Sequence, residues 1–486
     1  MTTHIDSLDP ATNEVLGRVP VLHPEEVRAA TAQARTAARW WQDQGYPGRR
    51  RHLLAWRRQL ARHAEELIDL LHRENGKPRA DAALELLLSL EHIEWTAKNA
   101  HRVLRPTKRS PGLLTRNFSA RVERLPFGVV GVIGPWNYPL YTPNGSIATA
   151  LAAGNTVVFK PSEYTPLVAR WYVDAFTRAN PEAPPGILTL VTGDGQTGAA
   201  LCGAGVDKLA FTGSTATGRK VMGACAEQLV PVVLELGGKD AAIVAADADL
   251  PAAADAIAFG AMGNAGQTCV GIERVYVERS VRDRFLAELD EVLRGVAPGI
   301  AYGPMTMPGQ LDIVRRHVDD AIAAGAFTML GGSDSIGTRY IEPVVLVDPP
   351  HTCAAIQEET FGPTVTVTTV ESIDEAVRLA NDLPYGLAAA VFSRRRAREI
   401  AQQLDTGQVS VNSVLGFAAI ASLPLGGRGH SGFGRIHGPE GLQEFTRTRA
   451  IATQRFPIPG ISLLSFRRPP WLDRLLPRLI TWLHGR

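Results

Sequence analysis

Two short sequences, LELGGK at residues 234–239 and GQTC at residues 266–269, bound the stretch that organises the chain. Glu235 brings a carboxylate that can act as a general base, and Cys269 brings a thiol, the strongest ordinary nucleophile in proteins. An alanine-rich run at 249–262 with helical periodicity separates them. Because a helix between two loops can return its flanking segments to one cleft, we expect Glu235 and Cys269 to lie close together. Taken alone, a cysteine in a glycine-rich loop can also be a small residue that fills a turn.

Before this stretch, short apolar runs alternate with segments of helical periodicity. The runs end in polar, glycine-rich turns, and this pattern predicts parallel strands joined by helices. In such sheets, the turns that follow the carboxyl ends of the strands form the binding crevice. The expected strands are 129–133, 155–159, 187–191, 208–211 and 232–234, and the helices between them are 143–153, 165–178, 195–202 and 218–228.

The α/β pattern extends to both sides of this region. Helices with charged faces are expected at 24–41, 49–74 and 80–103, and Gly76 and Pro78 mark the end of the second one. The alternating Thr and Arg residues of 445–454 predict a solvated strand away from the core. After Cys269 a second α/β region is expected, with strands at 272–277, 344–347, 365–370, 388–392 and 409–411 and a helix at 281–293.

Length and composition narrow the class of protein. A chain of 486 residues is too long for one hydrophobic core, so two or three domains are expected. A net charge of +2 indicates no general attraction to nucleic acid or to a membrane. The four cysteines lack CxxC spacing, which argues against a zinc site or a disulfide framework, and Cys202, Cys225 and Cys353 are expected to be buried. Residues 1–10 do not resemble an export signal and no run of 18 apolar residues occurs, so we expect a cytoplasmic protein.

The turn FTGSTATG at 211–218 is a candidate phosphate site. Gly213 and Gly218 let the backbone pass close to a ligand, and the N-terminus of the helix that follows favours an anion. Neither the GxGxxG fingerprint nor the P-loop ending is present. By itself the segment could therefore be an ordinary glycine-rich turn.

Six motifs in a fixed order make the assignment specific. They are PWNYP at 135–139, KPSE at 160–163, FTGS at 211–214, LELGGK at 234–239, GQTC at 266–269 and ETFGP at 359–363. Together they resemble the NAD(P)-dependent aldehyde dehydrogenase superfamily, and the resemblance covers residues 6–449. The later motifs look closest to members that act on fatty and aromatic aldehydes, whereas the opening residues are more like the tetrameric branch.

The resemblance implies a covalent mechanism. Cys269 would attack the aldehyde carbonyl, and a thiol with an ordinary pKa of about 8.5 needs help to ionise at neutral pH. Asn137 would donate its side-chain amide to the resulting oxyanion, together with the Cys269 backbone N–H. Hydride transfer to the nicotinamide would leave a thioester, which water activated by Glu235 would hydrolyse.

The resemblance also implies how the cofactor binds. A carboxylate at Glu163 accepts the adenosine ribose hydroxyls of NAD but repels a 2′-phosphate, so NAD is favoured and NADP remains possible. Ser214 and the following helix would take the pyrophosphate, and Glu359 would hold the nicotinamide ribose. No metal is implied. The cofactor-binding residues implied are Ile133, Pro135, Trp136, Lys160, Glu163, Gly193, Gly213, Ser214, Gly218, Leu236, Glu359 and Phe361.

For the fold, the resemblance implies an α/β protein with a Rossmann-like cofactor domain, a second α/β catalytic domain and a small β element that mediates oligomerisation. The cofactor domain would comprise 1–112 and 127–235, the catalytic domain 236–425, and the bridging element 113–126 and 436–454. A homodimer or homotetramer is expected. The apolar sequence VLGFAAIA at 414–421 resembles the loop that lines the substrate site and carries no Arg or Lys, which favours an aliphatic or aromatic aldehyde.

Residues 455–486 form a C-terminal tail beyond the family core. Its apolar residues, among them Trp471, Leu475 and Leu479, fall on one helical face, and several arginines lie off that face. Pro477 would bend the helix or shift its start. Such a basic amphipathic helix can lie in a membrane interface. It can equally pack on a partner subunit or across the substrate entrance.

Three other functions compete with a hydrolytic dehydrogenase. In a CoA-acylating relative, coenzyme A rather than water would accept the acyl group, but such relatives commonly lack a base at the position of Glu235. A non-catalytic binding or structural protein of the same fold would have no need to retain Cys269, Glu235 and Asn137 together. A thiol hydrolase would need a histidine partner, which the sequence does not place.

Overall fold

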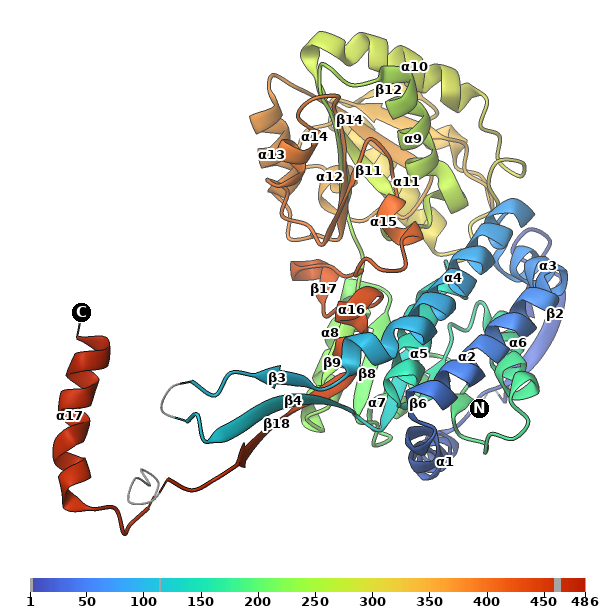
Figure 1. The fold of residues 1–486 in the computed structure, drawn as a ribbon. Coiled ribbons are helices and arrows are strands. Elements are labelled where there is room, and N and C mark those ends of the chain that lie inside the picture. The colour runs from blue at the N-terminus through green and yellow to red at the C-terminus, as the bar shows by residue number, and fades with distance from the viewer. Residues whose placement is uncertain (1–2, 113–114, 459–464, 486) are drawn as a thin grey trace. The chain divides into compact units, whose positions relative to one another are not determined.

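The computed structural model of the protein describes residues 3–112, 115–458 and 465–485. These residues form two compact units. The larger unit comprises 1–103 with 126–446, and the smaller comprises 104–125 with 447–486, apart from the residues outside the described ranges. Figure 1 labels many of the helices and strands of each unit.

The larger unit begins with an antiparallel strand pair and four helices. The strands β1 (His4–Leu8) and β2 (Val15–Pro20) were not expected from the sequence. The helix expected at 49–74 is two helices, because the chain leaves the helical conformation at His63 (φ −113°, ψ 32°), a break that no glycine or proline signals. The helices are α1 (Pro24–Asp43), α2 (Gly45–Arg62), α3 (Ala64–Asn75) and α4 (Arg79–Leu104).

The first large sheet has six strands in the order β17-β9-β8-β5-β6-β7. Its five longer strands are parallel, as predicted, and each lies within two residues of its expected bounds. The edge strand β17 (Gly432–Phe433), antiparallel to β9, comes from far downstream and was not predicted. The parallel strands are β5 (Val129–Ile133), β6 (Thr156–Lys160), β7 (Leu188–Leu190), β8 (Lys208–Thr212) and β9 (Val232–Glu235); the intervening helices are α5 (Tyr141–Ala153), α6 (Pro166–Ala179), α7 (Gly195–Cys202) and α8 (Thr215–Glu227).

The second large sheet has seven strands in the order β12-β13-β14-β11-β10-β15-β16, and only the edge strand β12 is antiparallel to its neighbour. The unpredicted strand β10 (Asp240–Val244) begins directly after LELGGK, so this motif carries the chain from the first sheet to the second. The other strands are β11 (Ile272–Glu278), β12 (Phe327–Leu330), β13 (Val344–Val347), β14 (Thr364–Val370), β15 (Ala388–Phe392) and β16 (Gln408–Val411).

Helices on this second sheet complete an α/β architecture, which confirms the predicted fold class. Among them, α9 (Leu250–Met262) is the predicted helix between the two central motifs, and its N-cap Asp249 accepts a hydrogen bond from the Ala252 N–H. The others are α10 (Arg282–Arg294), α11 (Gln310–Ala323), α12 (Ala354–Gln357), α13 (Ile373–Asn381), α14 (Ala397–Ala401) and α15 (Gly416–Ala419), and short 3-10 turns include η1 (Gly263–Gly266). Helix α16 (Gly438–Glu444) instead packs against α5, a helix of the first sheet.

The smaller unit contains a three-stranded antiparallel sheet and a C-terminal helix. The strands β3 (Thr107–Arg109), β4 (Phe118–Pro126) and β18 (Thr446–Gln454) lie in the order β18-β4-β3, and β18 matches the solvated strand expected at 445–454. The tail forms α17 (Pro470–His484), with Pro477 inside it. No helix in the described part of the chain is long and apolar enough to cross a lipid bilayer.

Candidate active site

The carboxyl ends of four neighbouring strands bring the predicted turns together in the larger unit. Ile133 at the end of β5 pairs in register with Lys160 on β6 and with Phe211 on β8. On the other side of β8, Thr212 pairs with Glu235 at the end of β9. The residues after these strands therefore share one edge of the sheet, where parallel sheets bind their ligands.

The loop before Cys269 has an unusual backbone. Residues 264–266 all have left-handed φ values, of 54°, 55° and 69°. A β-carbon on Gly266 would lie 2.0 Å from the Gly362 carbonyl oxygen, so only glycine fits there. The Gln267 side chain closes the turn by donating from Nε2 to the Asn264 carbonyl at 2.9 Å. The GQTC sequence is thus a tightly folded turn that presents the thiol.

The two central motifs meet at Gly238. A β-carbon on Gly238 would lie 2.6 Å from the Cys269 carbonyl oxygen, and one on Gly237 would lie 2.2 Å from a carboxylate oxygen of Glu359. The Glu359 carboxylate accepts the Gly238 N–H at 3.0 Å. Any larger residue at position 237 or 238 would therefore collide with Glu359 or with the Cys269 backbone.

Asn137 is buried beside the loop that carries the thiol. Its side-chain Nδ2 donates to the Gln267 carbonyl at 2.9 Å, two residues before Cys269. Its backbone carbonyl accepts hydrogen bonds from Asn264 Nδ2 at 3.0 Å and from Lys77 Nζ at 2.9 Å. The amide is therefore fixed against the loop that carries Cys269.

Lys77 and Glu85 are site-supporting residues that the sequence analysis missed. Both side chains are fully buried and form an ion pair at 2.5 Å. The Glu85 Oε1 atom also accepts the N–H groups of Leu140 at 2.8 Å and Tyr141 at 3.0 Å, at the start of α5. A carboxylate within the apolar sequence LELLLSL was the available signal, because an unpaired acid is rarely buried.

Glu235 has an environment suited to a base. Its side chain is 9% exposed, and its Oε1 atom has no hydrogen-bond partner among the described residues. Burial raises the pKa of the Glu235 carboxyl to about 8, and the Arg435 guanidinium only partly offsets that rise. The carboxyl therefore exchanges its proton near neutral pH.

The environment of the Cys269 thiol opposes its ionisation. Burial raises the pKa of Cys269 to about 12, and the carboxylates of Glu359, Asp240 and Glu235 add to this rise because each opposes a negative charge on sulfur. The thiol is thus protonated at neutral pH, and its attack on a carbonyl requires a proton acceptor. Glu235 is thus near enough to the thiol for its charge to act on the sulfur.

Trp136 and Phe361, two residues predicted to contact the cofactor, meet directly. Their rings are in an edge-to-face arrangement, with centroids 5.6 Å apart and planes at 86°. Phe361 has a left-handed φ of 55°, and its N–H donates to Glu273 at 3.0 Å, which holds the ring in this place. Burial raises the pKa of the neighbouring Glu359 to about 8, with a further contribution from Glu273.

The remaining predicted cofactor residues line the same strand edge. Lys160 is buried at the end of β6, with its Nζ atom 3.4 Å from the half-exposed Glu163 carboxylate. Burial lowers the pKa of Lys160, and Glu163 opposes that change. Ser214 caps α8 by accepting the Thr217 N–H at 3.3 Å.

Four further predicted residues lie close to these groups. The Gly213 N–H donates to the Glu235 carbonyl at 3.1 Å, and Gly218 lies against the Leu236 side chain. Gly193 is buried just before α7. Pro135 lies after β5, directly before Trp136. All twelve predicted cofactor-binding residues therefore lie on the elements of the first sheet, on the loops that follow its strands or in the loop at Glu359.

This set of groups fits a dinucleotide. The start of α8 offers backbone N–H groups to phosphates, the Glu163 carboxylate can accept ribose hydroxyls, and Trp136 with Phe361 offers an aromatic wall. Among the described residues, no cluster of three or more His, Cys, Asp or Glu side chains could hold a metal ion. Cys202, Cys225 and Cys353 are buried and free, as expected.

Comparison with known proteins agrees with this geometry. The model of the aldehyde dehydrogenase family matches residues 1–451. A Methylomonas protein named 4,4′-diapolycopene aldehyde oxidase is 40% identical over 471 residues, covering 94% of this chain and 87% of its own. A Mycolicibacterium smegmatis protein named as a putative NADP⁺ succinate-semialdehyde dehydrogenase is 38% identical over 456 residues, covering 91% and 87%.

Solved structures give the same result. An NAD-dependent aldehyde dehydrogenase from Sinorhizobium meliloti has a TM-score of 0.90 and 33% identity, with 94% of this chain and 93% of the other covered. An aldehyde dehydrogenase from Brucella melitensis has a TM-score of 0.89 and 33% identity, covering 94% and 95%. The chain belongs to the aldehyde dehydrogenase family. It is an NAD(P)-dependent aldehyde dehydrogenase.

Proposed function

We propose that the protein oxidises an apolar aldehyde to its carboxylic acid with NAD, through a thioester on Cys269 that water hydrolyses. The observation that carries this proposal is the buried Glu235 carboxyl, whose Oε1 atom has no hydrogen-bond partner among the described residues and whose charge raises the pKa of the Cys269 thiol. A base held in this way is needed for hydrolysis but not for acyl transfer to a thiol. Residue roles follow from this arrangement.

In the first half-reaction, the Cys269 sulfur bonds to the aldehyde carbon as its proton passes to a base. The oxygen that becomes negative accepts a hydrogen bond from the Asn137 amide, which Gln267 and Lys77 hold in place. The cofactor supplies the hydride acceptor. In the second half-reaction, Glu235 takes a proton from water and the hydroxide oxygen bonds to the thioester carbon. The carbon–sulfur bond then breaks, the proton held by Glu235 passes to the leaving sulfur, and the acid and the free thiol are released.

The pKa of Glu235 predicts how turnover depends on pH. Below about 8 the carboxyl holds its proton and cannot activate water, so the rate of thioester hydrolysis rises as pH rises through about 8 and then levels off. The measurement is the rate at which the acyl enzyme decays in a single turnover, determined at pH values on both sides of about 8. A decay rate that is flat between pH 6 and pH 9, roughly spanning the titration of Glu235, would contradict the assignment.

NAD is proposed as the preferred cofactor because Glu163 is half-exposed at the place expected for the adenosine ribose, where a 2′-phosphate would meet a negative charge. Replacing Glu163 with glutamine removes this repulsion. We expect the ratio of kcat/KM for NAD to that for NADP to fall at least about tenfold in Glu163→Gln, the scale of one unfavourable charge contact. If this ratio is unchanged in Glu163→Gln, residues other than Glu163 determine the choice between NAD and NADP.

The substrate is proposed to be an aliphatic, aromatic or polyene aldehyde. The loop 414–421 contains no cation, and the Tyr141 hydroxyl donates to the Ala418 carbonyl at 2.7 Å, so it holds the apolar loop rather than a substrate carboxylate. A buried charge left without a partner costs several kcal/mol, which is enough to decide specificity. We expect kcat/KM for a medium-chain alkanal to exceed that for succinate semialdehyde by roughly 100-fold. A preference for the semialdehyde would refute this substrate class.

The domain roles are also proposed. Residues 1–112 and 127–235 would bind the cofactor, 236–425 would complete the catalytic site, and 113–126 with 436–454 would bridge subunits in a homodimer or homotetramer. The boundaries of the two compact units differ from these proposed boundaries. Helix α16 falls within the proposed bridging segment 436–454 but belongs to the larger compact unit. The tail 455–486 is proposed to make peripheral membrane contact, which would suit a lipid-soluble aldehyde.

A further inference from the structure

A buried ion pair contacts the loop that carries Glu359 and Phe361. The pair consists of Lys239, the last residue of LELGGK, and Glu273, the second residue of β11. Burial lowers the pKa of Lys239, and the Glu273 carboxylate opposes that change. An ion pair in such a place is stable only where further hydrogen bonds satisfy the remaining polar atoms of both groups.

The backbone of the loop supplies those hydrogen bonds. The Glu273 Oε2 atom accepts the Thr360 N–H at 2.8 Å, and its Oε1 atom accepts the Phe361 N–H at 3.0 Å. Lys239 Nζ donates to the Thr360 hydroxyl at 3.0 Å as well as to Glu273. One carboxylate therefore binds two successive peptide groups of the loop, and one ammonium binds both the carboxylate and the loop.

These two peptide groups determine where the neighbouring side chains point. Phe361 has a left-handed φ of 55°, a conformation that residues with a side chain rarely adopt unless other contacts hold them. Its ring meets Trp136, and two positions earlier the Glu359 carboxylate accepts the Gly238 N–H at 3.0 Å. Because residues 359–361 are consecutive, a contact that fixes the peptide groups between them also fixes the Glu359 carboxylate and the Phe361 ring.

Other contacts hold the loop at different atoms. Gln310 Nε2 on α11 donates to the Thr360 carbonyl at 2.7 Å. The Gly362 carbonyl lies so close to Gly266 that a β-carbon there would be 2.0 Å away. Neither contact binds the N–H of Thr360 or of Phe361. Loss of the ion pair should therefore leave the loop attached at both places while its central peptide groups become free to rotate.

We propose that Lys239 and Glu273 are positioning residues that hold the loop 359–361 in the form that binds the nicotinamide ribose. This inference rests on the proposed function, in which Glu359 binds that ribose. It assigns a role to the lysine that ends the LELGGK motif. Neither residue needs to touch the cofactor, because both act through the backbone of Thr360 and Phe361.

The expected effect is on cofactor binding and hydride transfer. The affinity for a ligand falls in proportion to the fraction of molecules in the binding form. If loss of the pair leaves the loop in that form about a tenth of the time, the Kd for NADH rises about tenfold. A displacement of about 1 Å in a reacting group can lower a rate about 100-fold, so the NADH burst should slow by about 10-fold to 100-fold.

The test variant combines Lys239→Met and Glu273→Leu. Both charges are removed together because one alone would be left buried without its partner. A second variant, Lys239→Met with Glu273→Gln, keeps one acceptor oxygen for the loop N–H groups. It should recover part of the NADH affinity, and it tests the proposal even if the first variant folds poorly.

The matched control is Lys208→Met with Glu444→Leu. Lys208 is also a buried lysine that pairs with a glutamate, at 2.7 Å, but it is the first residue of β8 and lies at the opposite end of that strand from the cofactor edge. The control should lower Tm as the test variant does and leave the Kd for NADH within about twofold of wild type.

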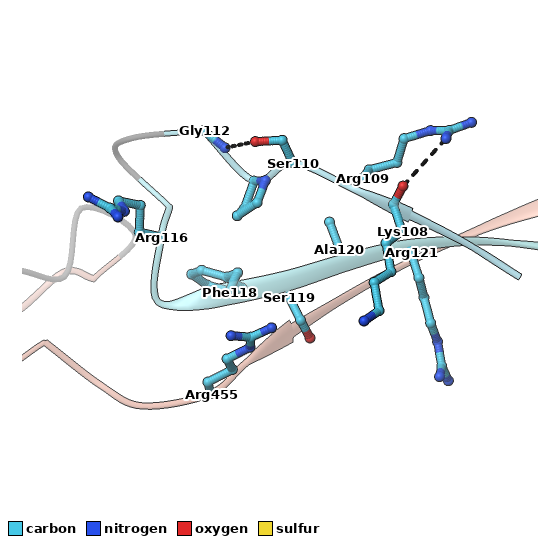
Figure 2. A pocket seen from close by; sticks show the side chains of 11 residues that line it. Lys108, Arg109, Ser110, Gly112, Arg116, Phe118, Ser119, Ala120, Arg121 and Arg455 are labelled. Carbon is cyan, nitrogen blue, oxygen red and sulfur yellow. Dashed lines mark hydrogen bonds between the residues drawn. The ribbon is translucent and has the colours of Figure 1, made fainter.

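A change in oligomeric state would be a separate cause of weaker binding, so the molecular mass of each variant is measured. The segment proposed to bridge subunits includes part of the β3–β4 hairpin in the smaller unit, where Lys108, Arg116 and other residues line a pocket of about 770 Å³ (Figure 2). Lys239, Glu273 and the loop 359–361 belong to the larger unit. The mass of the test variant should therefore equal that of wild type.

Hydrolysis of p-nitrophenyl acetate without cofactor separates the loop from the nucleophile. The Cys269 sulfur bonds to the ester carbon, p-nitrophenolate leaves, and water hydrolyses the acetyl thioester, so no hydride is transferred. The Gln267 side chain closes the nucleophile turn through Asn264 and does not contact the ion pair. The rate of ester hydrolysis in the test variant should therefore stay within about threefold of wild type.

The positioned groups provide a final control. In a background with Glu359→Ala and Phe361→Ala, the loop no longer carries the groups that the pair positions. Adding Lys239→Met and Glu273→Leu there should raise the Kd for NADH less than about twofold. The Kd is measured by fluorescence titration in every variant.

A wild-type Kd for NADH in the test variant, or an undiminished effect in the Glu359→Ala, Phe361→Ala background, overturns the positioning role. So does a loss of ester hydrolysis as large as the loss of NADH affinity, because the damage would then be general. A wild-type protein that neither oxidises aldehydes nor hydrolyses the ester would instead count against the proposed function, and the Kd measurements would still decide the role of the pair.

Discussion

Cys269→Ala is expected to abolish NADH formation, with kcat at least about 10⁴-fold below wild type, because the substitution removes the nucleophile of the proposed covalent mechanism. Cys269 is partly exposed at the end of a turn whose carbonyl meets Gly238, and three acidic groups raise the pKa of its thiol. Removing one sulfur atom leaves the strand ends that surround the cofactor groove intact. The Kd for NAD, measured by fluorescence titration, should therefore stay within about threefold of wild type.

The matched control for this variant is Cys353→Ala, which removes a buried thiol from the core of the second sheet and should keep wild-type kcat. Appreciable turnover by Cys269→Ala, with the control equally active, would exclude a covalent mechanism. Loss of NAD binding together with activity would show instead that the substitution damages the fold.

Glu235→Gln is expected to separate the two halves of the reaction. The variant should form about one NADH per active site in a rapid burst, after which steady turnover falls at least about 100-fold, because the amide cannot take a proton from water. The substitution also removes a buried carboxyl group whose negative charge raises the pKa of the Cys269 thiol. The burst rate should therefore not fall below wild type by more than about threefold.

Stopped-flow absorbance of NADH measures both phases. Glu444→Gln serves as the control, since Glu444 also acts on the Glu235 carboxyl but pairs with Lys208 at 2.7 Å instead of facing the thiol. A linear time course without a burst in Glu235→Gln would mean that Glu235 acts before hydride transfer. A steady turnover rate equal to that of wild type in Glu235→Gln would show that Glu235 has no catalytic role.

The architecture around the cofactor groove could be predicted because its signals are local. The apolar runs ending at Ile133 and Lys160 stop at proline-containing turns, and β5 has its predicted bounds. The helical run between Glu235 and Cys269 could also be predicted, and it is α9. These inferences needed no knowledge of distant contacts.

The missed features depend on residues far apart in the chain. Strand β17 joins the first sheet by pairing Gly432 with Glu235, and no local pattern in two residues predicts that. Lys77 between glycine and proline looked like the end of a helix, and only its contact with Asn137, 60 positions away, shows its place in the site. The glycines of LELGGK are likewise explained only by Glu359 and the Cys269 carbonyl.

The central claim is that the acyl group is carried on Cys269 and passed to water. The most direct measurement is mass spectrometry of Glu235→Gln quenched after one burst with NAD and a medium-chain alkanal, followed by peptide mapping, with a parallel sample that receives coenzyme A before the quench. The account predicts one acyl group per chain, on the peptide that contains Cys269, and no acyl-CoA. Absence of the adduct, an adduct on another residue, or rapid release as acyl-CoA would contradict it.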